Sequence, residues 1–290
     1  MAFRGHTPPR GDKAPVSSAQ NPVFKMLGRL VGGNPADGET MLVFLEGEKL
    51  LREADLAGWD LRWLVSAGTI PEDLGNERTV RLNMDAPLLN RLSRLETPAP
   101  LMGVVESRSW PTLEATLKVA ETVVVLDRVQ DPGNVGTIAR SLEALGGEAL
   151  LLLKGSCSAV NDKAIRASMG ALFRVPVYVG LEPETLFNSL SQAGISTVAT
   201  SACGCPLWDF AFPRRVALLM GTEGEGLRPE FIEMCEACVS IPMRGRAESL
   251  NVAAATAICL YERHRGGKFP NDGTQISGPK SGPVMTKEAE

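Results

Sequence analysis

A series of strongly apolar runs between residues 122 and 221 constrains the fold more than any other feature of this sequence. The runs lack the alternation of apolar and polar residues that marks a sheet with one solvated face. Strands of this kind are buried on both faces, as in parallel sheets flanked by helices. The runs are TVVVLD (122–127), ALLLL (149–153), VPVYV (175–179), ISTVAT (195–200) and VALLMG (216–221).

Helical patterns lie between and after these runs, where a parallel sheet requires crossover connections. We therefore predict one α/β domain over residues 122–265, with a parallel sheet covered by helices on both faces. The predicted helices are Ile138–Leu145, Asp162–Met169, Pro183–Ala193 and Ser249–His264.

The preceding part of the chain predicts a smaller α/β domain over residues 18–107. Residues 108–121, with Trp110-Pro111, interrupt the pattern and are predicted to be a linker. Residues 1–17 and 266–290 are rich in Pro, Gly, Ser and charge, and we expect disordered tails there. The predicted elements are helices at 23–31, 48–57 and 87–95 and strands at 41–45, 61–66 and 101–105.

Composition limits the class of protein. The 290 residues are 44% hydrophobic, yet no run approaches the roughly 20 apolar residues of a membrane span. Because the first residues also lack the apolar core of a signal peptide, we expect a soluble, cytoplasmic protein. The formal net charge of −4 argues against nonspecific, charge-driven binding of nucleic acid. A chain with this net charge can still have a local basic surface.

The six cysteines are too sparse for the disulfide framework of a small secreted protein, so we expect reduced thiols. Two pairs of cysteines, Cys203 with Cys205 and Cys235 with Cys238, together supply four thiols, which is the number of ligands in a structural zinc site. Their spacing departs from the usual ribbon of two Cys-x-x-Cys pairs with a shorter gap. We therefore expect no metal and favour small, structural side chains for all six.

Three segments of the larger domain follow apolar strands, where open α/β sheets bind ligands. The first, residues 126–146, contains a turn signature at 131–134. Gly136 follows it and is expected to let the chain approach a neighbouring group closely, before the helix that carries Arg140. An ordinary strand-to-helix turn with Asn134 as a cap explains the same residues equally well.

The second segment, residues 217–230, has three glycines in six residues directly after an apolar run. The backbone there must be exposed and tightly bent. The segment lacks the Lys-Ser/Thr of a P-loop, and Glu223 and Glu225 repel phosphate. It also does not match G-x-G-x-x-G, so a neutral or cationic adenosine ligand suits it better than a nucleotide.

In the third segment, residues 240–265, a short strand passes through a polar loop into a helix of small apolar residues. Such a helix suits a subunit interface or a crowded core. Ser249 and Asn251 fall at the predicted helix start. We expect Ser249 to cap this helix, and Asn251 either to cap it or to contact a ligand.

In this order and spacing, the three segments resemble the signature motifs of SpoU-type ribose methyltransferases in the SPOUT superfamily. The matching stretches are DPGNVGTIARSLEALG, LLMGTEGEGL and IPMRGRAESLNVAAATAICLYE. The stretches NPVFKMLGRL, FLEGEKLLREA and TPAPLMGVVE resemble more weakly the family's ribosomal-protein-like substrate-binding domain. One departure is Gly38-Glu39-Thr40, where family members often carry a basic residue.

The resemblance implies a knotted parallel-sheet domain, a homodimer, and S-adenosyl-L-methionine bound near Gly221, Ile241 and Leu250. It implies methylation of a ribose 2′-hydroxyl in RNA, with rRNA favoured over tRNA. The implied catalytic residues are Asn134, Arg140, Glu223, Ser249 and Asn251.

Arg140 is the family's usual general base, but a guanidinium stays protonated in proteins. We therefore expect Arg140 to clamp a phosphate and stabilise a developing alkoxide, with base action as a second hypothesis. Two other functions remain open at this point. One is a noncatalytic, dimeric RNA-binding protein; the other is a small-molecule enzyme on a Rossmann-like sheet, against which the missing glycine fingerprint argues.

Overall fold

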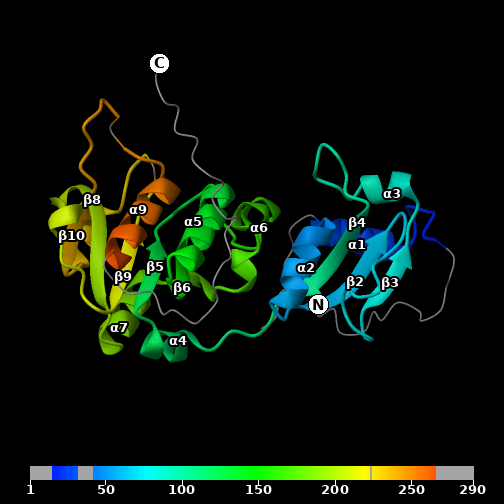
Figure 1. The fold of residues 1–290 in the computed structure, drawn as a ribbon, viewed down its shortest axis with the longest axis horizontal. Helices are drawn as coiled ribbons and strands as arrows, with labels where there is room; N and C mark the ends of the chain where they lie inside the picture. Colours follow the sequence, from blue (N-terminus) through cyan, green and yellow to red (C-terminus); the bar gives the residue numbers. More distant parts are fainter. Residues whose placement is uncertain (1–14, 32–41, 223, 248, 266–290) are drawn as a thin grey trace, which may run out of the picture.

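The computed structural model describes residues 15–31, 42–222, 224–247 and 249–265. Most of the two predicted tails and the predicted site residue Glu223 lie outside these residues. Figure 1 shows two lobes, connected by a segment that contains helix α4 (Leu113–Val119). None of the helices in the described part of the chain combines the length and apolar character needed to cross a bilayer.

The larger lobe is built on a parallel sheet in the order β10-β8-β9-β5-β6-β7. Each apolar run of the sequence contributes a strand, which confirms the predicted parallel sheet. Because the strands are parallel, their carboxyl ends open at one edge. The strands are β5 (Thr122–Leu126), β6 (Ala149–Leu153), β7 (Val177–Leu181), β8 (Ser196–Pro206), β9 (Val216–Met220) and β10 (Ala237–Ser240).

Helices cover both faces of this sheet, as predicted. Alternate residues of β5 divide between two cores: Val124 packs with α5, α6 and α9, whereas Val123 packs with α4, α7 and α8. Both faces of the strand are therefore buried, which explains its lack of polar residues. The helices are α5 (Pro132–Ala144), α6 (Asp162–Ser168), α7 (Pro183–Gln192), α8 (Pro229–Met234) and α9 (Val252–His264).

The smaller lobe has a mixed sheet in the order β1-β4-β2-β3, in which β4 is antiparallel to both neighbours and β2 is parallel to β3. Its core holds Leu27 of α1 and Leu89 of α3. The elements are α1 (Pro22–Val31), β1 (Leu42–Glu46), α2 (Glu48–Leu56), β2 (Asp60–Ser66), β3 (Val80–Asn83), α3 (Ala86–Asn90) and β4 (Leu101–Glu106).

The two lobes are joined by a buried contact between Trp59 and Phe173. The Trp59 indole donates to the carbonyl of Phe173 at 3.0 Å, and the two rings meet edge to face with centroids 5.0 Å apart. Beside them, Arg174 pairs with Glu53 of α2 at 2.6 Å and with Glu143 of α5. The smaller lobe is therefore fixed to the helix that carries Arg140.

Several boundaries differ from those predicted. Helix α5 begins at Pro132 rather than at residue 138, because proline suits the first helical position and Asp131 caps the turn. The linker contains α4, whose Leu117 is buried. Helix α3 ends at Asn90 rather than at residue 95. Two short elements, β3 and α8, were not predicted, since neither has a clear apolar period.

The predicted close approach at Gly136 is confirmed: the glycine lies against the backbone of α6. A Cβ atom at Gly136 would be 2.1 Å from the carbonyl oxygen of Ala164. Only glycine allows the two helices to approach this closely.

We expect Gly136→Ala to lower the free energy of unfolding by about 1–3 kcal/mol, because the added methyl group must push α5 and α6 apart. Gly28→Ala in α1 is the matched control. Nothing lies within 4 Å of a Cβ there, so helix propensity predicts a gain of up to about 1 kcal/mol. Urea unfolding measures both. Equal changes in the free energy of unfolding for the two variants would show that the close contact between α5 and α6 does not require glycine at position 136.

Candidate functional site

The three motif segments meet the carboxyl edge of the large sheet. The first runs from the end of β5 into α5, the second follows β9, and the third runs from β10 into α9. Strands β5 and β9 are neighbours, and β8 separates β9 from β10. The topology therefore brings segments that are about a hundred residues apart in sequence to one edge, where open α/β sheets bind ligands.

A hydrogen bond between two predicted site residues ties the first segment to the third. The Asn251 side-chain nitrogen donates to the Asn134 side-chain oxygen at 3.0 Å. The Asn251 oxygen accepts from the backbone N–H groups of Ala253 and Ala254 at 3.0 and 3.3 Å. Both ends of the Asn251 amide are thus used, one to cap α9 and the other to hold the start of α5.

This arrangement corrects two capping predictions. Asn251, not Ser249, is the N-cap of α9, and Ser249 lies exposed before the helix. At the start of α5 the cap is Asp131 rather than Asn134. The Asp131 carboxylate accepts from Lys163 at 2.6 Å and from the N–H of Gly133 at 2.8 Å, and these bonds lower its pKa. The Asn134 side chain is consequently not needed as a cap.

A buried ion pair that the sequence analysis missed holds the second segment. Asp127, at the end of β5, is fully buried and accepts two hydrogen bonds from Arg228, at 2.7 and 3.0 Å. The Arg228 guanidinium also lies over the Phe231 ring, 4.0 Å from its centroid. A charged residue at the end of an otherwise aliphatic run was the available signal, since buried carboxylates require a partner.

The loop after β9 closes on itself around Gly221. Thr222 and Gly226 exchange backbone hydrogen bonds of 3.1 and 2.9 Å. A Cβ at Gly221 would be 2.1 Å from the backbone of Gly226 and Leu227, and Gly226 itself has a φ of 71°. The tight turn expected from these glycines is therefore present.

Arg140 lies on α5 and is exposed. Among the described residues, its guanidinium has no hydrogen-bond or ion-pair partner. By contrast, Lys163 beside the start of the same helix pairs with Asp131. Within the described part of the chain, Arg140 is thus an exposed and unpaired cation.

The loop between β10 and α9 offers backbone groups to a ligand. Its described residues, 241–247 and 249–250, make no backbone–backbone hydrogen bond. Ile241 and Leu250 are half-buried at its two ends, and Ile241 packs against the core. Aliphatic side chains next to free N–H and C=O groups match what an adenine ring requires: apolar contact on its faces and hydrogen bonds at its edge.

The cysteines give no support to a zinc site. Within the described ranges, no three His, Cys, Asp or Glu side chains are grouped so that they could hold a metal ion. Cys203 and Cys205 are exposed, and burial raises the pKa of Cys235 to about 12. A thiol with so high a pKa is protonated at neutral pH and is a weak nucleophile.

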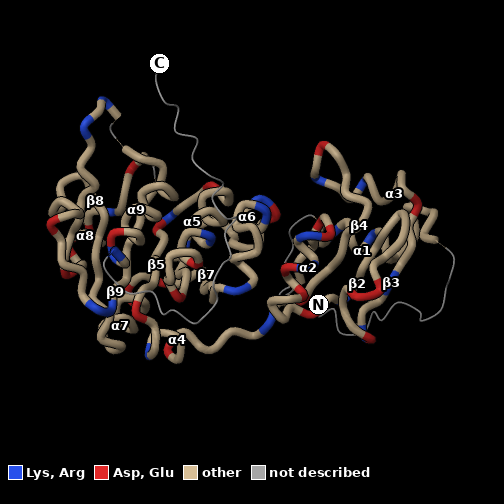
Figure 2. Tube along the Cα trace, in the orientation of Figure 1, with Lys and Arg blue, Asp and Glu red and all other residues tan. Residues whose placement is uncertain are grey.

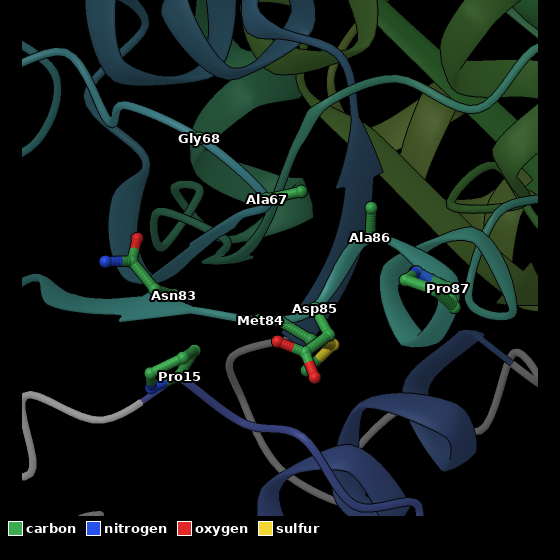
Figure 3. Close-up of a pocket in the computed structure, with 8 residues that line it drawn as sticks. All are labelled: Pro15, Ala67, Gly68, Asn83, Met84, Asp85, Ala86 and Pro87. Atoms are coloured by element: carbon green, nitrogen blue, oxygen red, sulfur yellow. The ribbon is translucent and has the colours of Figure 1, made fainter.

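A separate cavity of about 540 Å³ lies in the smaller lobe, beside the ends of β2 and β3. Figure 3 shows residues that line it, among them Asn83, Met84, Asp85, Pro15 and Pro87. None of the predicted site residues lines this cavity, so it does not belong to the candidate site.

Because Asn251 has two structural roles, two substitutions separate them. Asn251→Ala removes the cap and is expected to lower the free energy of unfolding by about 1 kcal/mol. Asn251→Asp keeps the capping oxygen but loses the donor to Asn134, so stability should change by less. Thermal unfolding monitored by circular dichroism measures both. A larger loss in Asn251→Asp than in Asn251→Ala would contradict the capping role.

Comparison with known proteins identifies this arrangement. The profile of the SpoU rRNA Methylase family matches residues 121–261, which include the first two motif segments and most of the third. A Bacillus subtilis protein named 23S rRNA (guanosine(2553)-2′-O)-methyltransferase RlmP is 33% identical over 77% of this chain and 88% of its own length. A Streptomyces viridochromogenes 23S rRNA (uridine(2479)-2′-O)-methyltransferase is 30% identical over 88% of this chain and 95% of its own.

Solved structures extend the similarity to both lobes. An AdoMet-bound rRNA methyltransferase from Sinorhizobium meliloti superposes with a TM-score of 0.75 and 30% identity, over 88% of this chain and 99% of the other. The SpoU methyltransferase AviRb from Streptomyces viridochromogenes gives 0.74 and 30%, over 84% and 97% of the two chains. The matching sequence profile and these full-length similarities lead to one conclusion: the chain belongs to the SpoU rRNA methylase family.

Proposed function

We propose that this protein transfers the methyl group of S-adenosyl-L-methionine to a ribose 2′-hydroxyl of ribosomal RNA. The observation that carries the proposal is the meeting of three motif segments at one sheet edge, two of them tied by the Asn134–Asn251 bond. The names of the Bacillus and Streptomyces relatives describe 2′-O-methylation of 23S rRNA, and this supports rRNA over tRNA as the substrate.

The loops after β9 and β10 are the proposed cofactor site. Gly221 permits the tight turn after β9, and Ile241 and Leu250 flank the free backbone groups of the loop after β10. These groups suit an adenosine, as the solved AdoMet-bound relatives support. When bound, the cofactor supplies an electrophilic methyl group on a positively charged sulfur.

Arg140 is proposed to supply the positive charge that binds the RNA and stabilises the reacting oxygen. Its exposed guanidinium has no partner among the described residues, and it stays charged throughout the reaction. It therefore binds a phosphate of the RNA and stabilises negative charge that develops on the ribose oxygen. A protonated guanidinium cannot accept the ribose proton, so we assign Arg140 this role rather than that of a base, and the ribose proton passes to solvent water.

The remaining motif residues are proposed to position the ribose. Methyl transfer requires the oxygen to be held in line with the methyl group, and positioning provides much of the acceleration. Asn134 is already oriented by Asn251, and exposed Ser249 precedes the same helix. Glu223 lies outside the described residues; its place in the second motif suits a residue that orients Arg140 or its own loop.

We assign RNA capture to the smaller lobe, residues 18–107, and methyl transfer to residues 122–265. The contact between Trp59 and Phe173 supports this division of labour, because it fixes the smaller lobe beside α5. We also infer that the last part of the chain is threaded through a loop as a knot, an exception among folds. The return of α9 to pack against α5 and β9 supports this path.

A homodimer is proposed through α9. Ala254, Ile258 and Tyr261 are exposed and follow the i, i+4, i+7 spacing that places them on one helix face. Ile258 and Tyr261 are 39% and 60% exposed, although both are large and apolar in part. A second copy of the same helix face is the proposed partner, because a closed dimer buries the same patch on both subunits.

The dimer proposal predicts that Tyr261→Arg converts a dimer into a monomer, because it places two charges in a self-complementary interface. Sedimentation velocity measures the mass. Leu56→Arg is the control, since Leu56 of α2 is also apolar and is 86% exposed. Dissociation by both variants, or by neither, would contradict an interface centred on α9.

The proposed reaction is tested with tritiated S-adenosyl-L-methionine and unmodified rRNA or tRNA, followed by nucleoside analysis. We expect label in a 2′-O-methyl nucleoside from rRNA. Arg140→Ala should lower the rate by about 100-fold or more while cofactor affinity stays the same. Arg214→Ala is the control, because Arg214 is exposed and pairs with Glu121 away from the site.

Label in tRNA alone would change the proposed substrate. Cofactor binding or RNA binding without label in any RNA would favour a noncatalytic RNA-binding protein. Full activity of Arg140→Ala would remove Arg140 from the reaction.

A further inference from the structure

The cations of the larger lobe divide sharply into bound and free ones. Most Lys and Arg side chains described between residues 122 and 265 pair with a carboxylate or donate to backbone carbonyls. Those with a carboxylate are Arg128, Lys154, Lys163, Arg166, Arg174, Arg214, Arg228 and Arg265, and those with carbonyls are Arg215 and Arg263.

Within the same described residues, the cations that have no such partner are Arg140, Arg244 and Arg246. One is the arginine of the first motif. The other two are exposed in the loop between β10 and α9, which the third motif includes. The free positive charge of this lobe is therefore confined to two of the three motif segments.

The loop holds its two arginines away from the body of the lobe. Figure 2 shows the blue positions of this loop at its projecting end, above α9. The sequence of this loop, residues 241–250, contains one acidic residue, Glu248, which lies outside the described residues. The loop ends at Asn251, whose bond to Asn134 anchors it at the start of the helix that carries Arg140.

An arginine without a partner in the protein suits a phosphate ligand, because its planar donors match two phosphate oxygens. An arginine that serves only solubility does not need to lie next to the motif residues. Elsewhere in this lobe, exposed arginines such as Arg214 and Arg265 are paired with carboxylates. The formal net charge of the chain is −4, so attraction of RNA has to come from a local group of cations.

We propose that Arg244 and Arg246 bind phosphates of the RNA strand next to the nucleotide that is methylated. The two side chains hold the strand over the carboxyl edge of the sheet, while Arg140 acts at the target ribose. This inference rests on the proposed function and adds two RNA-binding residues to it.

The test is the salt dependence of RNA binding by the full chain, measured with unmodified rRNA by filter binding across a range of KCl concentrations. Arg244→Gln/Arg246→Gln should weaken binding by about tenfold or more at 0.1 M salt. The slope of log affinity against log salt should fall by about 1.4–1.8, since each lost phosphate contact removes about 0.7–0.9. Arg244→Lys/Arg246→Lys should keep most of the slope, because the charges remain.

Lys118→Gln is the control, because Lys118 is exposed and unpaired among the described residues. It belongs to α4, and this helix lies away from the loop in Figure 1. Its slope should equal that of the unchanged protein. In the methyl-transfer assay, the double Gln variant should raise KM for RNA more than it lowers kcat, because the two arginines bind the RNA strand rather than the reacting ribose.

An unchanged salt slope in the double Gln variant would overturn the proposal. So would loss of the dimer in sedimentation velocity without a change in slope, because the loop would then contact the partner subunit. If the salt slope falls in the double Gln variant but the unchanged protein methylates no RNA, the phosphate contacts are supported and the proposed reaction is rejected. The two failures are therefore distinguishable.

Discussion

The buried ion pair between Asp127 and Arg228 is the interaction on which the carboxyl edge of the large sheet depends. It joins the end of the central strand β5 to the loop after β9, and the Asp127 carboxylate is fully buried. Loss of Arg228 would leave the buried Asp127 carboxylate with only the longer 3.5 Å contact to Arg128, and breaking a buried pair in this way costs up to about 3–5 kcal/mol. The Asn134–Asn251 bond then attaches the third segment to the first. Together, the two contacts hold all three motif segments at one edge.

Charge pairing explains how an acidic chain is suited to act on RNA. Most cations of the larger lobe are neutralised by a neighbouring carboxylate, so they add little to long-range attraction. Arg140 and the two loop arginines lack such partners among the described residues. Attraction is then limited to one region, and this favours binding in one orientation over nonspecific adhesion.

The parallel sheet could be predicted because strands buried on both faces leave a strong apolar signal, as in β5 and β6. Helix starts were less predictable, since Ser249 and Asn251 have similar capping chemistry and only the fold decides between them. Asp127 was missed because its partner is 101 residues away in the sequence. Motif matches named the candidate site residues, and the structure adds a contact between two of them; their roles in the reaction remain predictions.

The Trp59–Phe173 contact has a consequence for the choice of target nucleotide. With an indole hydrogen bond, an aromatic contact and the ion pairs of Arg174 at one seam, the smaller lobe cannot pivot freely against α5. If that lobe captures RNA as proposed, the distance between the captured RNA and the methyl-transfer site is fixed. A modified nucleotide would then be chosen by its distance from the captured structure, and a few seam residues could reset that distance without any change at Asn134 or Arg140.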